Sequence, residues 1–399
     1  MHRSGGIPVK NLLEVASQFK FPAAIDSIEP HGSGIINDTY IVTFKNAPES
    51  GASRHGKRAV LQRINDHVFP DPNMIMQNLS TVLEHANKKT SAVYPGFILP
   101  SMYMTRQETT SVTDSEGKTW RALAFIENSV TFDILQNATQ AREAGAALGA
   151  FHQLLSDIPV DNLHDTLPGF HDTPVYLAQY DAVAAQWRLN IAEENIANSE
   201  HFNTVDEMLA SREFCFSHIE NNRPLASLIY NAQPPIPLRI THGDPKLNNF
   251  LFDQDSGKAI SIIDLDTIKA GYIHYDLGDC IRSCCNRGGE MPQDITDVQF
   301  AVDNFEAILR GYLSTAGGLL DKHDFELLYD VVRLLPFELG IRFFTDYLNG
   351  NRYFKVTSPD DNLYRARVQF ELLNSIESLE KAVKNIIEQS TGHVLQQRD

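Results

Sequence analysis

Apolar and polar residues in the first third of the chain follow short β-type patterns separated by turn residues. The segment YIVTF at 40–44 contains five strong strand formers in a row, and AVLQRI at 59–64 is a second candidate strand. Two more strands are expected at 101–107 and 119–125, on either side of the turn DSEGK. The pattern therefore predicts a small β-sheet in this part of the chain.

Helical spacing of apolar residues accompanies this sheet at 10–19 and at 72–89. The segment FIENSVTFD at 125–133 is interpreted as a hinge, and helical patterns dominate after it. The helices expected there are 141–155, 175–197, 204–220, 294–314, 322–347 and 362–389. The clear strand patterns in this part are 238–241 and a hairpin over 249–263.

The two patterns together predict an α+β, bilobal fold. A small β-rich N-lobe would comprise residues 1–126, and a larger, mainly helical C-lobe would comprise residues 127–399. A chain of 399 residues exceeds the size of a usual single core, which supports two lobes. A ligand site is expected in the cleft between them.

Composition and charge narrow the class of protein. The net charge of −17 argues against a nucleic-acid partner, because phosphate binding needs a basic surface, and it disfavours anionic membranes. The N-terminus lacks the apolar core of a secretory signal, and no stretch approaches about eighteen apolar residues. We therefore expect a cytoplasmic protein with a small-molecule substrate and no obligate protein partner. The cysteines contain no C-x-x-C pair, so buried reduced thiols are favoured over a zinc site.

Three polar residues in the second half of the chain form a pattern suited to phosphoryl transfer. In ITHGDPKLNNFLFD, Asp244 stands five residues before Asn249, and Asp264 follows in SIIDLDT. The turn DQDSG between two short strand patterns predicts a hairpin that returns Asp264 to the loop of Asp244. Asp244 would accept or orient the proton of an acceptor hydroxyl, whereas Asn249 and Asp264 offer oxygens that suit Mg2+. The pattern predicts a kinase that uses ATP.

The nucleotide site is expected mainly in the N-lobe. In HGSGIINDTYIV, the backbone amides of Gly32, Ser33 and Gly34 would approach the phosphates, although an ordinary hairpin turn explains the same residues. Adenine would lie against the hinge at Phe125 and Glu127.

Kinases carry a lysine on the third strand, paired to a glutamate on the next helix. Here Arg63 stands on that strand, and Glu84 is its candidate partner. Arginine can grip phosphate in two places, but a plain surface role for Arg63 is the alternative. In DLGDCIR, we expect Asp279 to brace the catalytic loop and Asp276 to cap the helix.

Two clusters in the C-lobe are candidate contacts for the acceptor. The segment PGFHDTP places His171 and Asp172 between turn residues, and GIRFFTDYLNGNRYF contains Arg342 and Tyr353. The aromatic residues of the second cluster are core residues by default. Arg342 is flanked by apolar residues, and a buried guanidinium needs partners.

These segments together resemble the aminoglycoside phosphotransferase-like superfamily, which also includes choline and homoserine kinases. Within it, they are most similar to N-acetylhexosamine 1-kinases. The resemblance spans about residues 31–354 and is carried by GIINDTYIV, LQRINDHVFPDP, PGFHDTP, HGDPKLNNFLFD, IIDLDT, DLGDCIR and GIRFFTDYLNGNRYF. It implies a two-lobed protein-kinase-like fold that transfers the γ-phosphate of ATP to the anomeric (C1) hydroxyl of GlcNAc or GalNAc.

The resemblance also implies roles for single residues. Asp244 would be the base, Asn249 and Asp264 the magnesium ligands, and Arg342 and Tyr353 would stand at positions that touch the sugar. The tripeptide SCC after DLGDCIR departs from the family, which often carries an aromatic residue in that helix. This departure leaves the precise sugar open.

Two alternatives remain open from the sequence. The acceptor would instead be an amino-alcohol or an aminoglycoside if carboxylates cluster around the acceptor site, whereas Arg342 and neutral hydroxyl-binding groups favour a sugar. The other alternative is a non-catalytic nucleotide-binding protein, which the missing strand lysine keeps open.

Overall fold

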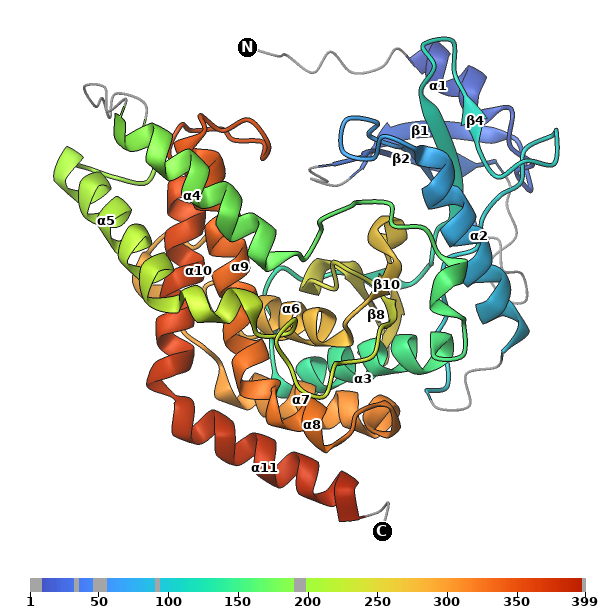
Figure 1. The fold of residues 1–399 in the computed structure, drawn as a ribbon. Coiled ribbons are helices and arrows are strands. Elements are labelled where there is room, and N and C mark those ends of the chain that lie inside the picture. Colours follow the sequence, from blue (N-terminus) through green and yellow to red (C-terminus); the bar gives the residue numbers. More distant parts are fainter. Residues whose placement is uncertain (1–8, 32–35, 46–55, 90–93, 190–198, 397–399) are drawn as a thin grey trace.

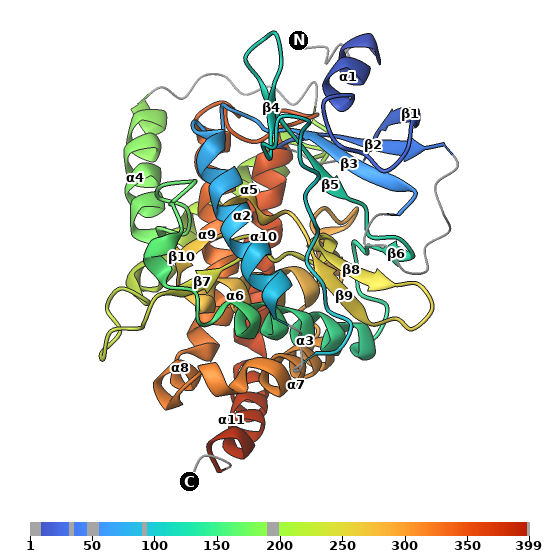
Figure 2. The same ribbon diagram turned by 90° about the vertical axis from the view of Figure 1, so that its right-hand side faces the viewer.

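The computed structural model of the protein describes residues 9–31, 36–45, 56–89, 94–189 and 199–396. Figure 1 shows the N-terminal strands beside a larger body of helices. In Figure 2 the N-terminal sheet and the C-terminal helix lie at opposite ends of the molecule. The predicted α+β class, with a β-rich N-lobe and a helical C-lobe, is confirmed. The boundary between residues 126 and 127 stays a prediction.

The N-lobe sheet consists of antiparallel strands in the order β1-β2-β3-β5-β4. The strand bounds are β1 Ile25–Pro30, β2 Asp38–Phe44, β3 Arg58–Arg63, β4 Val112–Thr113 and β5 Thr119–Ala124. Side chains alternate between the two faces of the sheet. One face carries buried Tyr40, Leu61 and Ala122, in the same cluster as apolar residues of α1 (Val9–Ala16). The opposite face carries Gln62 and Arg121, which are paired across β3 and β5.

Helix α2 (Pro72–Lys88) comes from the N-terminal third of the chain but packs on the helical body. The side chain of Asp71 caps its first turn. Asn78 is fully buried and donates to the carbonyl oxygens of His164 and Ile268. These contacts attach α2 to the C-lobe.

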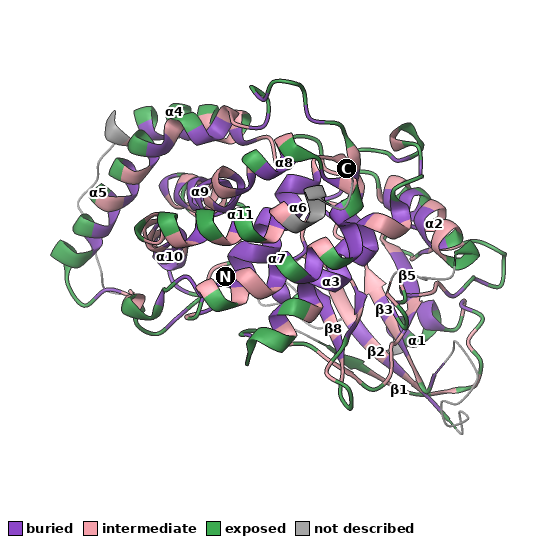
Figure 3. Cartoon of the chain, turned by 90° about the horizontal axis from the view of Figure 1, so that it is seen from below, coloured by how far each residue is buried: buried purple, intermediate pink, exposed green. Residues whose placement is uncertain are grey.

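The helices of the C-lobe surround one large apolar core. Their bounds are α3 Ala138–Leu155, α4 Thr173–Leu189, α5 Val205–Asn222, α6 Ile273–Cys284, α7 Val302–Ala316, α8 Lys322–Glu326, α9 Leu328–Leu348, α10 Asp361–Ser378 and α11 Glu380–Gln396. Figure 3 shows buried residues concentrated around α3, α6 and α7. None of the described helices has the length and apolar character needed to cross a membrane.

Helices α3 and α7 approach each other closely because glycine stands at their contact. A Cβ at Gly145 would lie 2.1 Å from the backbone oxygen of Ile308, and one at Gly311 would lie 2.0 Å from that of Arg142. Any larger residue at either position would push the two helices apart.

Within the described part of the C-lobe, the structure contains two small sheets. Strand β7 (Arg239–Thr241) pairs with β10 (Lys269–Gly271), while β8 (Phe250–Asp253) pairs with both β9 (Ala259–Ile262) and β6 (Ser129–Val130). The predicted strand near residue 240 and the predicted hairpin are confirmed. Because β6 follows β5 after a short connection, the hinge leads directly from one sheet into the next.

The strand predicted at 101–107 is wrong. This segment makes only isolated bridges to its neighbours among the described residues. The backbone N–H of Thr105 bonds to the oxygen of Thr109 at 2.7 Å, and its hydroxyl oxygen accepts the N–H of Thr109. This local turn takes the chain away from the sheet.

One predicted helix begins later than expected, and two others are each divided into two helices. The helix expected at 294–314 begins only at Val302, because the Asp294 side chain accepts the N–H and the hydroxyl of Thr296 and forms a separate turn. The other two are each divided, at Leu327 and at Leu379. Apolar periodicity continues across these breaks, so it did not reveal them.

Candidate active site

The chain turns sharply between β7 and Asp244. Gly243 has a φ of +88°, in the left-handed region that favours glycine. A Cβ at Gly243 would lie 2.9 Å from side-chain atoms of Thr267, so the neighbouring loop leaves no room for a larger residue. Local backbone geometry thus fixes the direction in which Asp244 leaves the loop.

A buried carboxylate, Asp276 of α6, anchors this loop. Its Oδ2 accepts the backbone N–H of His242 at 2.6 Å, and its Oδ1 accepts that of Gly243 at 2.9 Å. His152 Nε2 lies 2.8 Å from Oδ2. Burial would favour the neutral acid, but these donors outweigh it and hold the pKa of Asp276 below its ordinary value.

The structure does not give Asp276 and Asp279 the roles that were expected of them: Asp276, and not Asp279, braces the loop. Tyr272 precedes the first turn of α6, and Asp276 directs its carboxylate to the loop instead of capping the helix. Asp279 forms an ion pair with Arg282 at 2.7 Å, and Arg282 also contacts Glu290 at 2.8 Å. Asp276 and Asp279 lie about one turn apart on α6, so the sequence alone does not show which of them contacts the loop; tertiary packing decides it.

The ring of His242 joins the loop of Asp244 to the strand that leads to Asp264. Its Nδ1 accepts the backbone N–H of Asp244 at 3.2 Å, so Nε2 carries the proton and donates to the oxygen of Ile263 at 2.9 Å. Burial lowers the pKa of His242 and keeps the ring neutral. The neutral ring therefore bridges the two segments through one hydrogen bond to each.

The hairpin brings Asn249 and Asp264 to the same place. Asn249 donates through Nδ2 to the backbone oxygen of Asp244 at 2.7 Å, and its own backbone oxygen accepts the N–H of Ile263 at 2.9 Å. Asp264 follows directly, with a left-handed φ of 66°. The structure thus gathers the three predicted residues, while their roles stay predictions.

Lys246 lies close to both carboxylates of this group. Its Nζ is 2.6 Å from Asp244 Oδ2. Burial opposes its charge, but Asp244 and Asp264 outweigh burial and raise the pKa of Lys246. Burial likewise favours the neutral form of Asp244, yet Lys246 holds the pKa of Asp244 below its ordinary value. Asp244 is therefore a carboxylate at neutral pH.

Asp264 carries a poorly balanced negative charge. Its side chain reaches solvent, but the protein atoms around it and the nearby Asp266 raise the pKa of Asp264 to about 6. A divalent cation would relieve this repulsion, and the amide oxygen of Asn249 would be a second hard ligand. The described residues contain no cluster of three or more His, Cys, Asp or Glu side chains suited to a metal. A magnesium ion here fits, provided that phosphate and water supply its remaining ligands.

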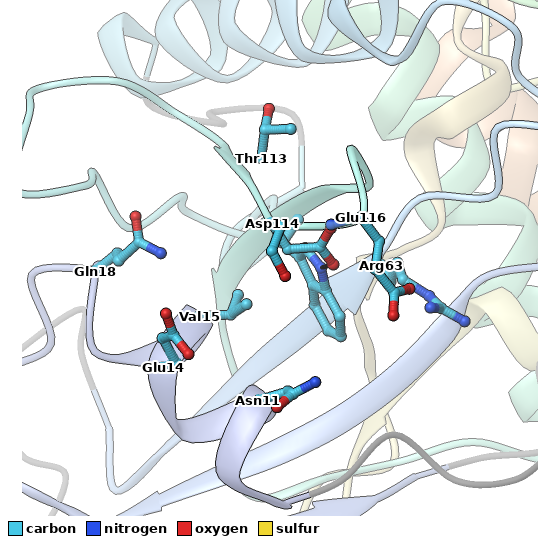
Figure 4. Close-up of a pocket in the computed structure, with 10 residues that line it drawn as sticks. Asn11, Glu14, Val15, Gln18, Arg63, Thr113, Asp114 and Glu116 are labelled. Carbon is cyan, nitrogen blue, oxygen red and sulfur yellow. Dashed lines mark hydrogen bonds between the residues drawn. The ribbon is translucent and has the colours of Figure 1, made fainter.

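The structure does not bring Arg63 to this group. Arg63 lies on the outer face of the N-lobe sheet, 2.5 Å from Asp38, and lines a pocket beside α1 that also contains Asp114 (Figure 4). Glu84, its expected partner, is exposed on α2. Because side chains alternate along a strand, the neighbouring Gln62 occupies the inner face instead.

Arg121 of β5 is a cation on the inner face, where it pairs with Gln62 across the two strands. Its Nη1 lies 2.5 Å from Asp266 Oδ1, and its Nε and Nη2 donate to Gln62 Oε1 at 3.1 and 2.9 Å. Arg121 thus connects the sheet to the loop that bears Asp264.

Phe125 and Glu127 lie in the connection between β5 and β6. The guanidinium of Arg58 lies 3.9 Å from the centroid of the Phe125 ring and 2.5 Å from the carboxylate of Glu127. Both side chains are therefore engaged by Arg58, and their contact with a nucleotide base stays a prediction. The predicted phosphate-loop residues lie outside the described part of the chain: Gly32, Ser33 and Gly34.

His171 holds the loop of Asp244 in place. Its Nδ1 lies 2.7 Å from Glu338 Oε1, and its Nε2 lies 2.7 Å from the backbone oxygen of Gly243. Both partners accept, so both ring nitrogens carry protons. Burial opposes the charge, but Glu338 outweighs burial and raises the pKa of His171. Both N–H groups are used within the protein, so the ring has no donor left for an acceptor molecule, and contact of His171 with the acceptor stays a prediction.

Arg342 of α9 is surrounded by aromatic rings. Its guanidinium carbon lies 5.2 Å from the ring centroid of Phe170, 5.1 Å from that of Tyr176 and 5.5 Å from that of Phe354. No described residue forms a hydrogen bond or an ion pair with it. Burial opposes its charge, yet the phenol of Tyr176 and carboxylates that include Asp244 raise the pKa of Arg342. Arg342 is thus a donor without a protein partner on the side of Asp244.

Tyr353 and Asp172 lie at the edges of this region. The Tyr353 side chain is exposed, and its backbone N–H donates to the buried carboxylate of Asp346 at 2.9 Å. Asp172 stands at the start of α4 and accepts the N–H of Val175 at 3.4 Å. Direct contact of either side chain with an acceptor stays a prediction.

Similar solved structures extend over nearly the whole chain. An aminoglycoside phosphotransferase from Alicyclobacillus acidocaldarius is 15% identical, with a TM-score of 0.58 and coverage of 96% of this chain and 98% of that chain. Spectinomycin phosphotransferase APH(9)-Ia, solved with ADP and spectinomycin, is 13% identical, with a TM-score of 0.59 and coverage of 94% and 99%. Amicoumacin kinase, solved with AMP-PNP, Ca2+ and amicoumacin, is 13% identical, with a TM-score of 0.58 and coverage of 92% and 94%. This likeness establishes the fold as protein-kinase-like.

The sequence also matches a known family directly. Residues 27–307, more than half of the chain, match the profile of the phosphotransferase enzyme family, APH. The protein therefore belongs to the APH phosphotransferase family and is a small-molecule phosphotransferase.

Proposed function

We propose that this protein is an ATP- and magnesium-dependent kinase that phosphorylates the anomeric (C1) hydroxyl of an N-acetylhexosamine such as GlcNAc or GalNAc. The observation that supports the chemistry best is the meeting of Asp244, Lys246, Asn249 and Asp264 on one loop and one hairpin. Phosphoryl transfer needs little more than an oriented hydroxyl and charge neutralisation.

Each residue of this group would have a distinct task. Asp244, kept ionised by Lys246, would accept the proton of the acceptor hydroxyl. Asn249 and Asp264 would hold magnesium, which neutralises charge on the transferred phosphoryl group when bound. The ammonium of Lys246 lies close to Asp244 and Asp264. Magnesium would partly neutralise these carboxylates, and Lys246 would then contact the same phosphoryl group.

The charges near Asp244 support a neutral, hydroxylated acceptor over a cationic amine. Two nearby carboxylates already have cationic partners, Asp279 with Arg282 and Glu338 with His171. The open group is Arg342, whose guanidinium donates to hydroxyl or carbonyl oxygens such as those of an N-acetylated sugar. The aromatic rings beside it offer apolar surface for a sugar ring.

A panel of acceptors tests this proposal. ATP consumption would be measured with GlcNAc, GalNAc, glucose, ethanolamine and an aminoglycoside, and phosphorus NMR would locate the new phosphate. We expect turnover with an N-acetylhexosamine and a phosphate at C1. A phosphate at another position rejects the 1-kinase assignment, and turnover with the amines supports the alternative acceptors. Nucleotide binding without turnover on any acceptor would support a non-catalytic role.

A further inference from the structure

A buried ion pair joins the N-lobe sheet to the loop after β9. Nη1 of Arg121 lies 2.5 Å from Oδ1 of Asp266, and the side chains are only 2% and 3% exposed. Asp266 stands two residues after Asp264, on the same short turn. A charge buried to this degree is stable only while its partner stays in place. The pair therefore ties the position of this turn to the sheet.

Both partners of the pair are held by further groups. The Arg121 guanidinium donates twice to Gln62 Oε1, while Oδ2 of Asp266 accepts Nδ2 of Asn37 at 2.7 Å. From the other side, the hydroxyl of Thr166 donates to the backbone oxygen of Asp266 at 2.8 Å. Asp266 therefore has partners in both lobes: Arg121 and Asn37 from the N-lobe, and Thr166 from a loop of the C-lobe.

We propose that Arg121 is a positioning residue that replaces the strand lysine of kinases: it pairs with Asp266 and so sets Asp264 for the metal-bound nucleotide. In kinases with the strand lysine, its partner is a glutamate on the following helix. Here the cation comes from the adjacent strand, and its partner belongs to the turn that bears Asp264. The inference rests on the proposed function, because it assumes that Asp264 holds magnesium with ATP.

Arg63 provides a matched control. It is also an arginine of this sheet that pairs with an aspartate, but it lies on the outer face and is partly exposed. Arg63→Gln removes the same charge from the same sheet without touching the loop after β9. Unfolding by urea would first show that both variants fold.

The experiment measures how much magnesium strengthens nucleotide binding. The affinity for a fluorescent ATP analogue would be titrated in EDTA and in excess Mg2+, and the ratio gives the magnesium enhancement. We expect Arg121→Gln to lose about tenfold or more of this enhancement, because partners of metal ligands typically contribute that much to metal affinity. Its affinity in EDTA should change far less, and Arg63→Gln should match the wild type in both conditions.

A double-mutant cycle with Asp266→Asn separates this positioning role from a general destabilisation of the N-lobe sheet. Since both residues act through one pair, the double variant should lose no more than the worse single variant. Additive losses, or full enhancement in Arg121→Gln, would overturn the inference. If Arg121→Gln does not fold, Arg121→Lys keeps the charge but lacks the fork that reaches both Gln62 and Asp266, and a wild-type enhancement there would also overturn it. A wild type that binds no ATP would overturn the proposed function itself.

Discussion

The ring of His171 donates from Nε2 to the backbone oxygen of Gly243, the residue immediately before Asp244. Its other nitrogen donates to Glu338 of α9, so one imidazolium connects the loop of Asp244 to a helix that also carries Arg342. On the opposite side of the same segment, the carboxylate of Asp276 accepts the backbone N–H groups of His242 and Gly243. His171 and Asp276 therefore restrain the loop from two sides.

The first prediction concerns stability as a function of pH. The negative charges near His171 come from Glu338 and Asp279, and Glu338 raises the pKa of His171 in the folded protein above the unfolded value of 6.5. A raised pKa contributes stability that is complete below the unfolded value and is lost as pH rises through the folded value. We expect the difference in unfolding free energy between wild type and His171→Gln to shrink above about pH 6.5. Urea unfolding at several pH values measures it, and a difference that grows with pH would contradict the assignment.

The second prediction concerns the anchor of the loop. Asp276→Ala leaves the N–H groups of His242 and Gly243 and the ring of His152 without their acceptor. Removing one member of such a buried charged network costs about 3–5 kcal/mol of unfolding free energy. The control Asp303→Ala removes an exposed carboxylate and should stay within about 0.5 kcal/mol of wild type. Equal stability of the two variants in urea would show that Asp276 does not anchor the loop.

The third prediction concerns the acceptor. Arg342→Met keeps apolar contact with the surrounding rings but removes the unpartnered donors. Loss of a hydrogen bond to a charged group should raise the acceptor KM roughly 10- to 100-fold. The KM for ATP should stay near that of wild type, and Arg310→Met, which removes an exposed arginine, should change neither value. An unchanged acceptor KM in Arg342→Met would place the acceptor elsewhere.

Local sequence patterns were enough to predict the group around Asp244. A hairpin with strong turn residues connects Asn249 to Asp264, so their meeting depends on few residues and on one register. Lys246 was missed although it belongs to the same HGDPK segment, because a lysine two residues from a carboxylate is also common on surfaces. Its proximity to Asp264 emerges only from the folded hairpin.

The residues that support the loop could not be predicted from the sequence for a different reason. The partners of His171 are 167 and 72 residues away in the chain, and nothing in PGFHDTP indicates them. The choice between Arg63 and Gln62 depends on a shift of one residue, which reverses the face of every side chain in a strand. Arg121 was overlooked because its buried partner becomes apparent only when the sheet meets the C-lobe.

We propose that Asp244 acts on the acceptor hydroxyl in a site assembled with Asn249 and Asp264. Single-turnover kinetics of Asp244→Asn, beside the exposed hairpin control Asp255→Asn, tests it most directly. We expect Asp244→Asn to transfer phosphate about 100- to 10,000-fold more slowly while nucleotide affinity is largely kept, and we expect the control to match wild type. Phosphoryl transfer at a near wild-type rate in Asp244→Asn would contradict it.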